Sequence, residues 1–271
     1  MIENESLKQK ILELVLNSDR KLSQSSIENI LSSELNIKRK EIRKALNGLI
    51  SEGELEYTYI FGTSYVEKSF NRPVRISSSV IVKPYNLTYN QLDSDIVIDI
   101  FPGISFGSGE HPTTRLSIQG IEYALKDQKL IHDFQNSTVL DIGTGSGILA
   151  IATLKFGIET GIGVDTDPCS ISEAKKNARI NGLENRIRIL NPSEQPNATF
   201  SFITANLRFP DIMNLFPVIS KNSKPGAPVV LSGIRPEEID AVIDRYTKNN
   251  FKCLLTSEEK NWSCLVLQKN N

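Results

Sequence analysis

The sequence predicts an α/β protein in which a doubly wound, mostly parallel sheet follows a small helical domain. Beyond about residue 113, apolar runs of strand length alternate with segments of helical periodicity, as in sheets that carry helices on both faces. A glycine-rich turn at residues 143–147 joins one of these strands to the next helix. Residues 6–53 instead show apolar residues at helical spacing only. The length of 271 residues accommodates two such domains.

The N-terminal segment predicts three short amphipathic helices and a hairpin. Ser25 or Ser26 can cap the second helix, and Gly53 ends the third. Apolar or aromatic residues alternate with polar ones from 54 to 61, and a turn at 62–63 and a short strand to residue 67 follow, which predicts two antiparallel strands. Three helices followed by a hairpin resemble a winged helix-turn-helix, which we assign to residues 1–69. The apolar helical positions are Leu7, Ile11, Leu14, Val15, Ile27, Ile30, Leu31, Ile42, Ala45, Leu46, Leu49 and Ile50.

Residues 70–98 predict a linker with short strands. Pro73, Pro84 and a serine run at 77–79 interrupt regular structure, while apolar runs at 80–82 and 96–100 have strand character. The sheet domain is therefore expected over residues 99–271. Its seven strands are expected at 138–142, 162–165, 187–190, 200–205, 228–232, 251–256 and 262–268, with helices at 148–156, 170–181 and 237–249.

The glycine-rich turn has the layout of a ligand-binding turn. Glycines let the backbone approach a ligand closely, and the helix that follows offers unpaired N–H groups. The spacing is G-x-G-x-G from Gly143, and Ile148 stands where a dinucleotide-binding fingerprint has its last glycine. Asp141, two residues before the first glycine, is typical of methyltransferases. The pattern thus disfavours a pyrophosphate ligand and favours S-adenosyl-L-methionine.

Asp165 ends the next strand, 22 residues after Gly143. A carboxylate at that place in such a fold can accept hydrogen bonds from both ribose hydroxyls of an adenosyl group. Asp165 could instead cap the following helix, but Asp167 is better placed for capping because it directly precedes Pro168. We expect Asp165 to bind the ribose.

A polar, turn-rich run precedes the glycine turn at residues 101–114, with the sequence FPGISFGSGEHPTT. Its glycines and prolines predict a loop over the ligand site. Together with VLDIGTGSGILAIATLKFG, GVDTDP, TANL, LSGI and NWSCLVLQK, this run resembles the PrmA family of ribosomal-protein methyltransferases over about residues 80–268. That family's loop typically reads AFGTG-x-H-x-TT, so this chain differs only by Ser105 and Ser108.

The resemblance implies a seven-stranded Rossmann-like methyltransferase sheet and transfer of methyl groups to lysine or N-terminal amines of a ribosomal protein. It implies that Asn206 aligns the attacking amine, although an asparagine after a strand can simply turn the chain. His111 could act as a base or could hold the loop. The expected cofactor-binding residues are Thr114, Gly143, Asp165, Asn206, Phe106, Gly107, Asp141, Thr144 and Gly145.

The N-terminal segment leaves the partner open, because the family's usual substrate-recognition domain is an α/β module rather than a winged helix. Residues 38–44 carry five Lys or Arg against one Glu. This excess fits a nucleic-acid-binding helix or a solvated helix face. The alternatives to a protein acceptor are therefore a nucleic-acid-associated methyltransferase, a small-molecule methyltransferase or a cofactor-binding regulator. The sequence leaves the oligomeric state open.

Composition excludes several other classes. The net charge of −1 and the absence of a long apolar window exclude a strongly basic protein and a membrane-spanning segment. Three separated cysteines and two histidines predict neither a metal site nor disulfides. Cys169, Cys253 and Cys264 are expected to be packing residues. We expect a cytoplasmic protein.

Overall fold

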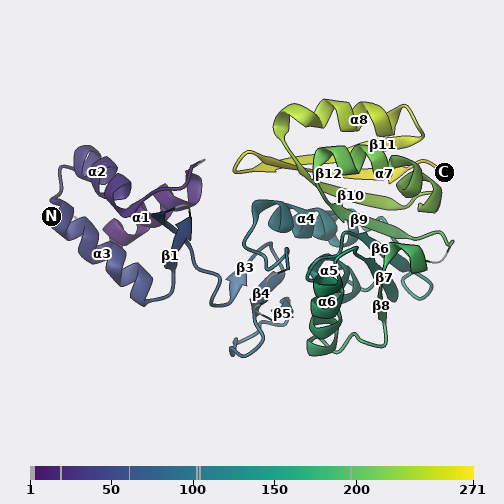
Figure 1. Cartoon of the computed structure of the whole chain (residues 1–271), viewed down its shortest axis with the longest axis horizontal. Helices are drawn as coiled ribbons and strands as arrows, with labels where there is room; N and C mark the ends of the chain where they lie inside the picture. Colours follow the sequence, from purple (N-terminus) through teal and green to yellow (C-terminus); the bar gives the residue numbers. More distant parts are fainter. Residues whose placement is uncertain (1–3, 19, 61, 102, 104, 196) are drawn as a thin grey trace. The chain divides into compact units, whose positions relative to one another are not determined.

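The computed structural model describes residues 4–18, 20–60, 62–101, 103, 105–195 and 197–271. Phe61 of the expected hairpin, and Pro102 and Ile104 of the expected binding loop, lie outside this part. The chain forms two compact units, Met1–Arg72 and Pro73–Asn271 (Figure 1). Each unit is described by itself below.

The first unit contains three helices and an antiparallel hairpin, in the order that the sequence predicts. A backbone hydrogen bond from Val66 N to Leu22 O, 2.8 Å long, attaches the hairpin to the segment before the second helix. The expected cap of that helix is wrong. Ser23, in extended conformation, accepts a hydrogen bond from Ser26 N, because Gln24 already starts the helix. The elements are α1 (Asn4–Asn17), α2 (Gln24–Leu35), α3 (Arg39–Ser51), β1 (Leu55–Ile60) and β2 (Thr63–Lys68).

The interval expected to hold a linker with short strands holds strands that form a small sheet of the second unit. Its strands are β3 (Val74–Arg75), β4 (Val80–Pro84) and β5 (Ile96–Ile100). β4 is parallel to β5 and antiparallel to β3. Asn181 bonds both backbone groups of Asp99, the N–H at 3.0 Å and the carbonyl at 2.7 Å. The start of the binding loop is thereby fixed to a helix of the main fold.

The large sheet has the seven mostly parallel strands that the sequence predicts. Their order is β11-β12-β10-β9-β6-β7-β8, and β12 alone is antiparallel to both its neighbours within this described sheet. The carboxyl ends of β6, β7, β9 and β10 therefore meet at one edge. The strands are β6 (Thr138–Ile142), β7 (Thr160–Val164), β8 (Ile187–Leu190), β9 (Phe202–Asn206), β10 (Pro228–Ile234), β11 (Phe251–Glu259) and β12 (Trp262–Lys269).

Helices cover both faces of the large sheet: α4, α5 and α6 pack in series, and α7 packs against α8 (Figure 1). The sequence analysis did not predict α4 or α7. Prolines obscure α7, since Pro217 lies inside it, and α4 is buried on several sides and so shows no simple apolar stripe. The helices are α4 (Pro112–Glu122), α5 (Ile148–Lys155), α6 (Pro168–Ile180), α7 (Phe209–Asn222) and α8 (Ile239–Thr247), and a π-helical turn, η1 (Tyr123–Asp127), extends α4.

Glu122 at the end of α4 joins this helix to the small sheet. Its side chain is buried and accepts hydrogen bonds from Ser78 N at 3.1 Å, from the hydroxyls of Ser78 and Ser79, and from Lys126. Burial alone would raise the pKa of Glu122, but these hydrogen bonds outweigh it and lower the pKa to about 2. The ionised carboxylate therefore stabilises the fold.

We expect Glu122→Gln to lower the free energy of unfolding at pH 7 by about 2 kcal/mol. Because the pKa of the folded state is depressed to about 2 from 4.5, this difference should be complete above pH 4.5 and should vanish toward pH 2. Urea unfolding of both proteins across this pH range measures it. The exposed Glu184→Gln serves as the control, and a difference that does not change with pH would contradict the assignment.

Candidate functional site

The glycine turn between β6 and α5 has positive φ angles at its three glycines. Gly143, Gly145 and Gly147 have φ of 70°, 53° and 84°, which disfavour residues with a side chain. The N–H groups of Gly143 and Thr144 both donate to Val164 O at 2.9 Å. A Cβ on Gly145 would lie 2.5 Å from Phe106 O. Glycine is needed here because another backbone segment lies directly against the turn.

Asp165 and Asp167 were the two candidates for capping the helix that follows β7. Asp167 caps α6, since its carboxylate accepts from Cys169 N at 2.9 Å and from Ser170 Oγ at 3.2 Å. Asp165 lines a cavity, and its Oδ2 accepts from Gly145 N at 2.9 Å. Helix capping therefore does not occupy Asp165, whose carboxylate lies at the glycine turn.

Asp141 and Thr144 lie beneath the turn rather than in the cavity. Asp141 is fully buried and accepts from Thr144 Oγ1 and Thr204 Oγ1, each at 2.7 Å, and from Ala150 N at 3.3 Å. Burial raises the pKa of Asp141 despite these bonds. Neither Asp141 nor Thr144 is among the described residues that line the cavity; their hydrogen bonds lie beneath the glycines, and their expected contact with the cofactor stays a prediction.

The loop of residues 105–111 lies over the glycine turn, as expected. Ser146 N donates to Phe106 O at 2.9 Å, and Ser146 Oγ donates to Gly107 O at 2.8 Å. Glu173 of α6 accepts from Ser105 N and Ser105 Oγ at 3.2 and 2.8 Å. Phe106 lines the cavity. Gly107 is not among the described lining residues, and it packs the loop against the glycine turn.

The two threonines that begin α4 differ in position. Thr113 lines the cavity, while Thr114 is fully buried behind it and is not among the lining residues. The Thr114 hydroxyl has no hydrogen-bond partner among the described residues. Successive helical residues point about 100° apart, so only one of the pair can face the cavity. The structure thus places Thr113, not Thr114, where the sequence analysis expected a cofactor contact.

His111 caps α4. Its Nδ1 accepts from Thr113 N at 3.3 Å and lies 2.8 Å from Thr113 Oγ1. The ring also lies in the cavity wall between Phe106 and Trp262, with ring centroids 5.1 Å apart on each side. These contacts give His111 a positioning role, and proton transfer by His111 stays a prediction.

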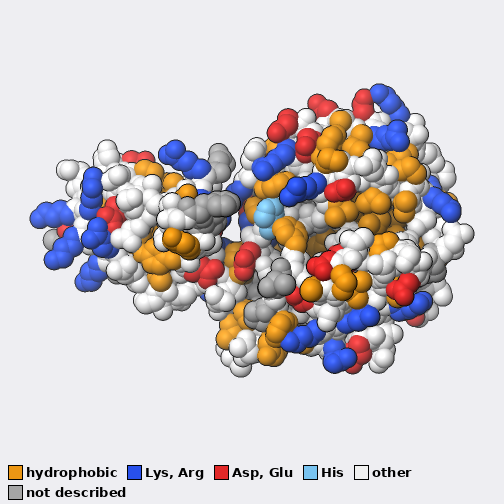
Figure 2. Space-filling model, viewed as in Figure 1, with side chains coloured by type: hydrophobic (Ala, Val, Ile, Leu, Met, Phe, Trp, Pro, Cys, Tyr) orange, Lys and Arg blue, Asp and Glu red, His pale blue; other side chains and the backbone are white. Residues whose placement is uncertain are grey.

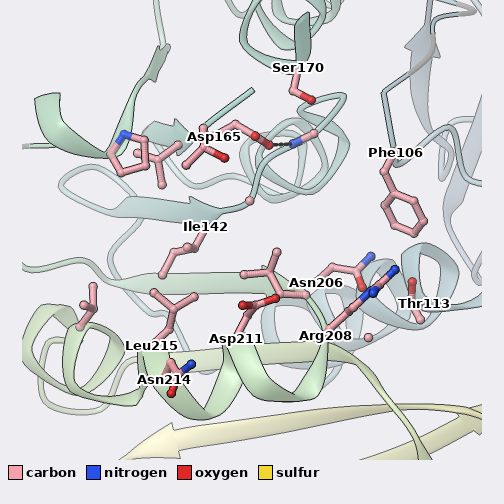
Figure 3. Close-up of a pocket in the computed structure, with 18 of the residues that line it drawn as sticks. Phe106, Thr113, Ile142, Asp165, Ser170, Asn206, Arg208, Asp211, Asn214 and Leu215 are labelled. Carbon is pink, nitrogen blue, oxygen red and sulfur yellow. Dashed lines mark hydrogen bonds between the residues drawn. The ribbon is translucent and has the colours of Figure 1, made fainter. Parts of the chain in front are cut away.

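The cavity has a volume of about 970 Å³ and lies at the carboxyl ends of the central strands, where open α/β sheets bind ligands. In Figure 3, Asn206, Arg208 and Thr113 lie together at one end, and Asp165 lies across from them. The expected residues that line it are Phe106, His111, Gly143, Gly145, Asp165 and Asn206. Residues from four separate segments of the sequence therefore meet in one site.

One helix contributes a wall that the sequence analysis missed. Asp211, Asn214, Leu215 and Val218 line the cavity from α7, at the i, i+3, i+4, i+7 spacing of one helical face (Figure 3). Arg208 precedes this helix and also lines the cavity. That spacing was a usable signal, but Pro210 and Pro217 hid the helix in the sequence. Arg208, Asp211 and Asn214 are the polar side chains of this wall.

No group of three or more His, Cys, Asp or Glu suited to a metal occurs among the described residues. Cys253 and Cys264 lie in strands, and burial raises the pKa of both thiols, to about 12 for Cys264. Cys169 is exposed, not packed as expected. Within the described part of the chain, no helix is long and apolar enough to cross a membrane.

The chain is similar to known proteins in sequence and in fold. A family model described as ribosomal protein L11 methyltransferase (PrmA) matches residues 2–270. The L11 methyltransferases of Geobacter metallireducens and Clostridium botulinum are each 34% identical to it over 196 and 201 residues. These matches cover 72% and 73% of this chain but only 62% and 61% of the relatives' own length.

A solved structure agrees with the sequence matches. The crystal structure of a ribosomal protein L11 methylase from Lactobacillus delbrueckii subsp. bulgaricus superposes with a TM-score of 0.65 at 28% identity. That alignment covers 74% of this chain and all of the other chain.

Proposed function

The chain belongs to the PrmA family of ribosomal protein L11 methyltransferases, and from this premise we propose that it transfers methyl groups from S-adenosyl-L-methionine to amines of a ribosomal protein. The observation that carries the proposal is the convergence of Gly145, Asp165 and Asn206 on one cavity at the strand ends. These residues come from three different strand–helix junctions. Turns that only connect strands to helices would not explain why these three side chains or backbone groups line the same cavity.

The residues present fit this cofactor. The glycine turn and Asp165 lie on one side of the cavity, and the Asp165 carboxylate is the acceptor that a ribose diol requires. Phe106, Ile142, Val164 and Leu207 supply apolar surface in the same cavity. S-adenosyl-L-methionine would be held by the glycine turn and Asp165, and it supplies an activated methyl group with a neutral sulfide leaving group.

The remaining task of the protein is to orient the acceptor and exclude water. A lysine amine has an ordinary pKa of about 10.4 and must lose its proton before attack. An apolar cavity wall lowers that pKa by desolvation. The Asn206 side-chain oxygen then accepts a hydrogen bond from the neutral amine and aligns its lone pair. Asp211 and Asn214 are further acceptors in the cavity wall.

Asp165→Asn is expected to weaken cofactor binding by about 10- to 100-fold, because a hydrogen bond to a charged group contributes about 1.5–3 kcal/mol. Asparagine keeps an oxygen for Gly145 N–H, so the turn should survive. Titration calorimetry with S-adenosyl-L-methionine measures the effect. Asp167→Asn, two residues away at the cap of α6, is the matched control and should bind like the wild type. Equal affinity of all three proteins would refute the ribose role of Asp165.

We propose that the first unit is a winged-helix module and that it contacts RNA, which would be a second partner of the chain. Four of its glutamates form ion pairs within the unit: Glu28, Glu52, Glu54 and Glu67 pair with Arg43, Lys8, Arg72 and Lys21. Four exposed cations at the start of α3 make no ion pair with a described residue, and Figure 2 shows basic side chains gathered on this unit. They are Lys38, Arg39, Lys40 and Lys44.

The placement of these cations costs helix stability. Positive charges at a helix start oppose the macrodipole, and like charges at i and i+4 repel. Tyr57 and Tyr59 on β1 are 46% and 74% exposed, and Tyr57 lies close enough to Arg43 to interact with it electrostatically. Cations and exposed aromatic rings on adjoining elements suit a phosphate backbone with unstacked bases.

The double variant Lys40→Glu/Lys44→Glu should bind a short RNA hairpin at least about 10-fold more weakly than the wild type at low salt. Lys10→Glu/Arg20→Glu changes two exposed charges elsewhere in the same unit and should lose much less. Fluorescence anisotropy at two salt concentrations reports both. Equal loss in the two variants, or a preference for duplex DNA, would exclude an RNA-binding α3 face.

A further inference from the structure

The tip of the β11–β12 hairpin is held in one conformation beside the proposed cofactor site. Lys260 and Asn261 form a two-residue turn with φ of 49° and 59°, the conformation that matches the twist of a hairpin. Glu259 and Trp262 are therefore directly opposite each other at the strand ends. Two side chains from other parts of the fold reach this tip.

The first link is ionic and passes through Arg115 of α4. Its Nε donates to Glu259 Oε1 and Oε2 at 3.0 and 3.2 Å. The same guanidinium donates to the carbonyls of Gly109, at 3.4 Å, and Glu110. The Arg115 side chain is only 12% exposed, so water screens this pair less than it would a surface pair. One side chain thus joins a helix, the hairpin tip and the binding loop.

The second link is aromatic and passes through Trp262. His111 of the loop lies 5.1 Å from the indole ring, and the guanidinium of Arg235 lies 3.7 Å from the ring centroid. Arg235 also donates to Asn261 O at 2.9 Å, so one side chain contacts both the turn and the indole ring. His111 in turn packs against Phe106. The hairpin tip is therefore attached to the loop at residues 109–111, and through the His111 ring to Phe106.

We infer that Arg115 and Glu259 are positioning residues that hold the glycine-rich loop in its cofactor-binding position. This inference rests on the proposed function. Neither residue is among the described residues lining the cavity, so each acts through the loop. The loop's Phe106 O lies against the glycine turn, where it accepts from Ser146 N. Releasing the loop adds conformational freedom that cofactor binding must remove again, which lowers affinity.

Glu259→Gln should raise the dissociation constant of S-adenosyl-L-methionine by about 5- to 20-fold, because it removes the charged acceptor of Arg115. Glu259→Asp keeps the charge and should restore most of the affinity. Glu258→Gln removes the same charge from the exposed neighbouring residue and should leave affinity unchanged. The KM for the cofactor should rise in Glu259→Gln, while the KM for the acceptor stays constant.

Trp262 provides a second readout that is independent of turnover. It is the single tryptophan of the chain and lines the cavity, so its fluorescence reports ligand binding directly. Emission spectra and thermal midpoints of each variant, with and without S-adenosylhomocysteine, distinguish a released loop from a destabilised fold. We expect Glu259→Gln to alter the emission of the ligand-free protein at a somewhat lower thermal midpoint, because it leaves the charge of Arg115 uncompensated, while the protein stays folded at the assay temperature.

The outcomes separate this inference from the proposed function. If the wild type fails to bind S-adenosyl-L-methionine, the proposed function falls. If the wild type binds but Glu259→Gln binds within about twofold of it, or Glu258→Gln weakens binding equally, the positioning role of Arg115 and Glu259 is overturned.

Discussion

Asn206→Ala is expected to reduce kcat by about 100-fold or more while the fold and most of the cofactor affinity survive. Asn206 ends β9 at the edge of the cavity, and its backbone remains paired with Ser232 whatever the side chain is. Truncation therefore removes the amide that would align the amine without disturbing the strand. Single-turnover measurements with a labelled cofactor separate the chemical step from binding.

Asn214→Ala is the matched control for this prediction. Asn214 lines the same cavity and carries the same amide, but it lies on α7 rather than at the end of β9. We expect at most about a fivefold loss of kcat, since a neutral hydrogen bond contributes about 1 kcal/mol. An Asn206→Ala enzyme with unchanged turnover would rule out the alignment role, and equal losses in both variants would leave Asn206 without a special one.

Gly145→Ala should weaken cofactor binding by about 100-fold or more, from strain and steric overlap together. Gly145 has φ of 53°, and its new Cβ would lie 2.5 Å from the backbone oxygen of Phe106. A backbone oxygen cannot move aside as a flexible side chain can, so the loop must shift away from the turn. Calorimetric titration with S-adenosyl-L-methionine measures the loss.

Gly182→Ala isolates the contribution of backbone strain. Gly182 has a similar φ of 68° after α6, and nothing lies within 4 Å of an added Cβ. It should lower stability by about 1 kcal/mol and leave cofactor affinity unchanged. If Gly145→Ala binds the cofactor as well as Gly182→Ala does, the close approach of loop and turn has no role in binding.

The sequence predicted those parts of the site that depend on local chemistry. A glycine turn between a buried strand and a helix is recognisable because positive φ values favour glycine and three glycines alternate within five residues. Asp165 and Asp167 could be distinguished because a proline after Asp167 marks a helix start. The seven strands were recognisable as short apolar runs. Each of these signals extends over only a few residues.

The parts that the sequence did not predict depend on long-range packing. α7 has helical periodicity, but its two prolines argue against a helix, and α4 is buried on several sides and shows no simple apolar stripe. The cavity wall formed by α7, and Trp262 on a hairpin far along the chain, become visible only once the sheet is assembled. Arg115 and Glu259 are 144 residues apart in sequence.

Side-chain direction explains the errors inside the motifs. Thr113 and Thr114 are adjacent in the chain, but only Thr113 faces the cavity. Asp141 and Thr144 lie next to the glycines in sequence, yet both side chains are buried and are hydrogen-bonded to each other. A motif identifies the segment that forms a site, whereas the local backbone decides which of its residues reach the ligand.

Transfer of labelled methyl groups to a purified ribosomal protein tests the central claim most directly. The wild-type chain is incubated with methyl-labelled S-adenosyl-L-methionine and the L11 protein of the same organism, and the labelled residues are mapped by mass spectrometry. We expect stable label on lysine or N-terminal amines, lost in Asn206→Ala. A chain that binds the cofactor but leaves L11 unlabelled, or that labels groups other than amines, would contradict the proposed function.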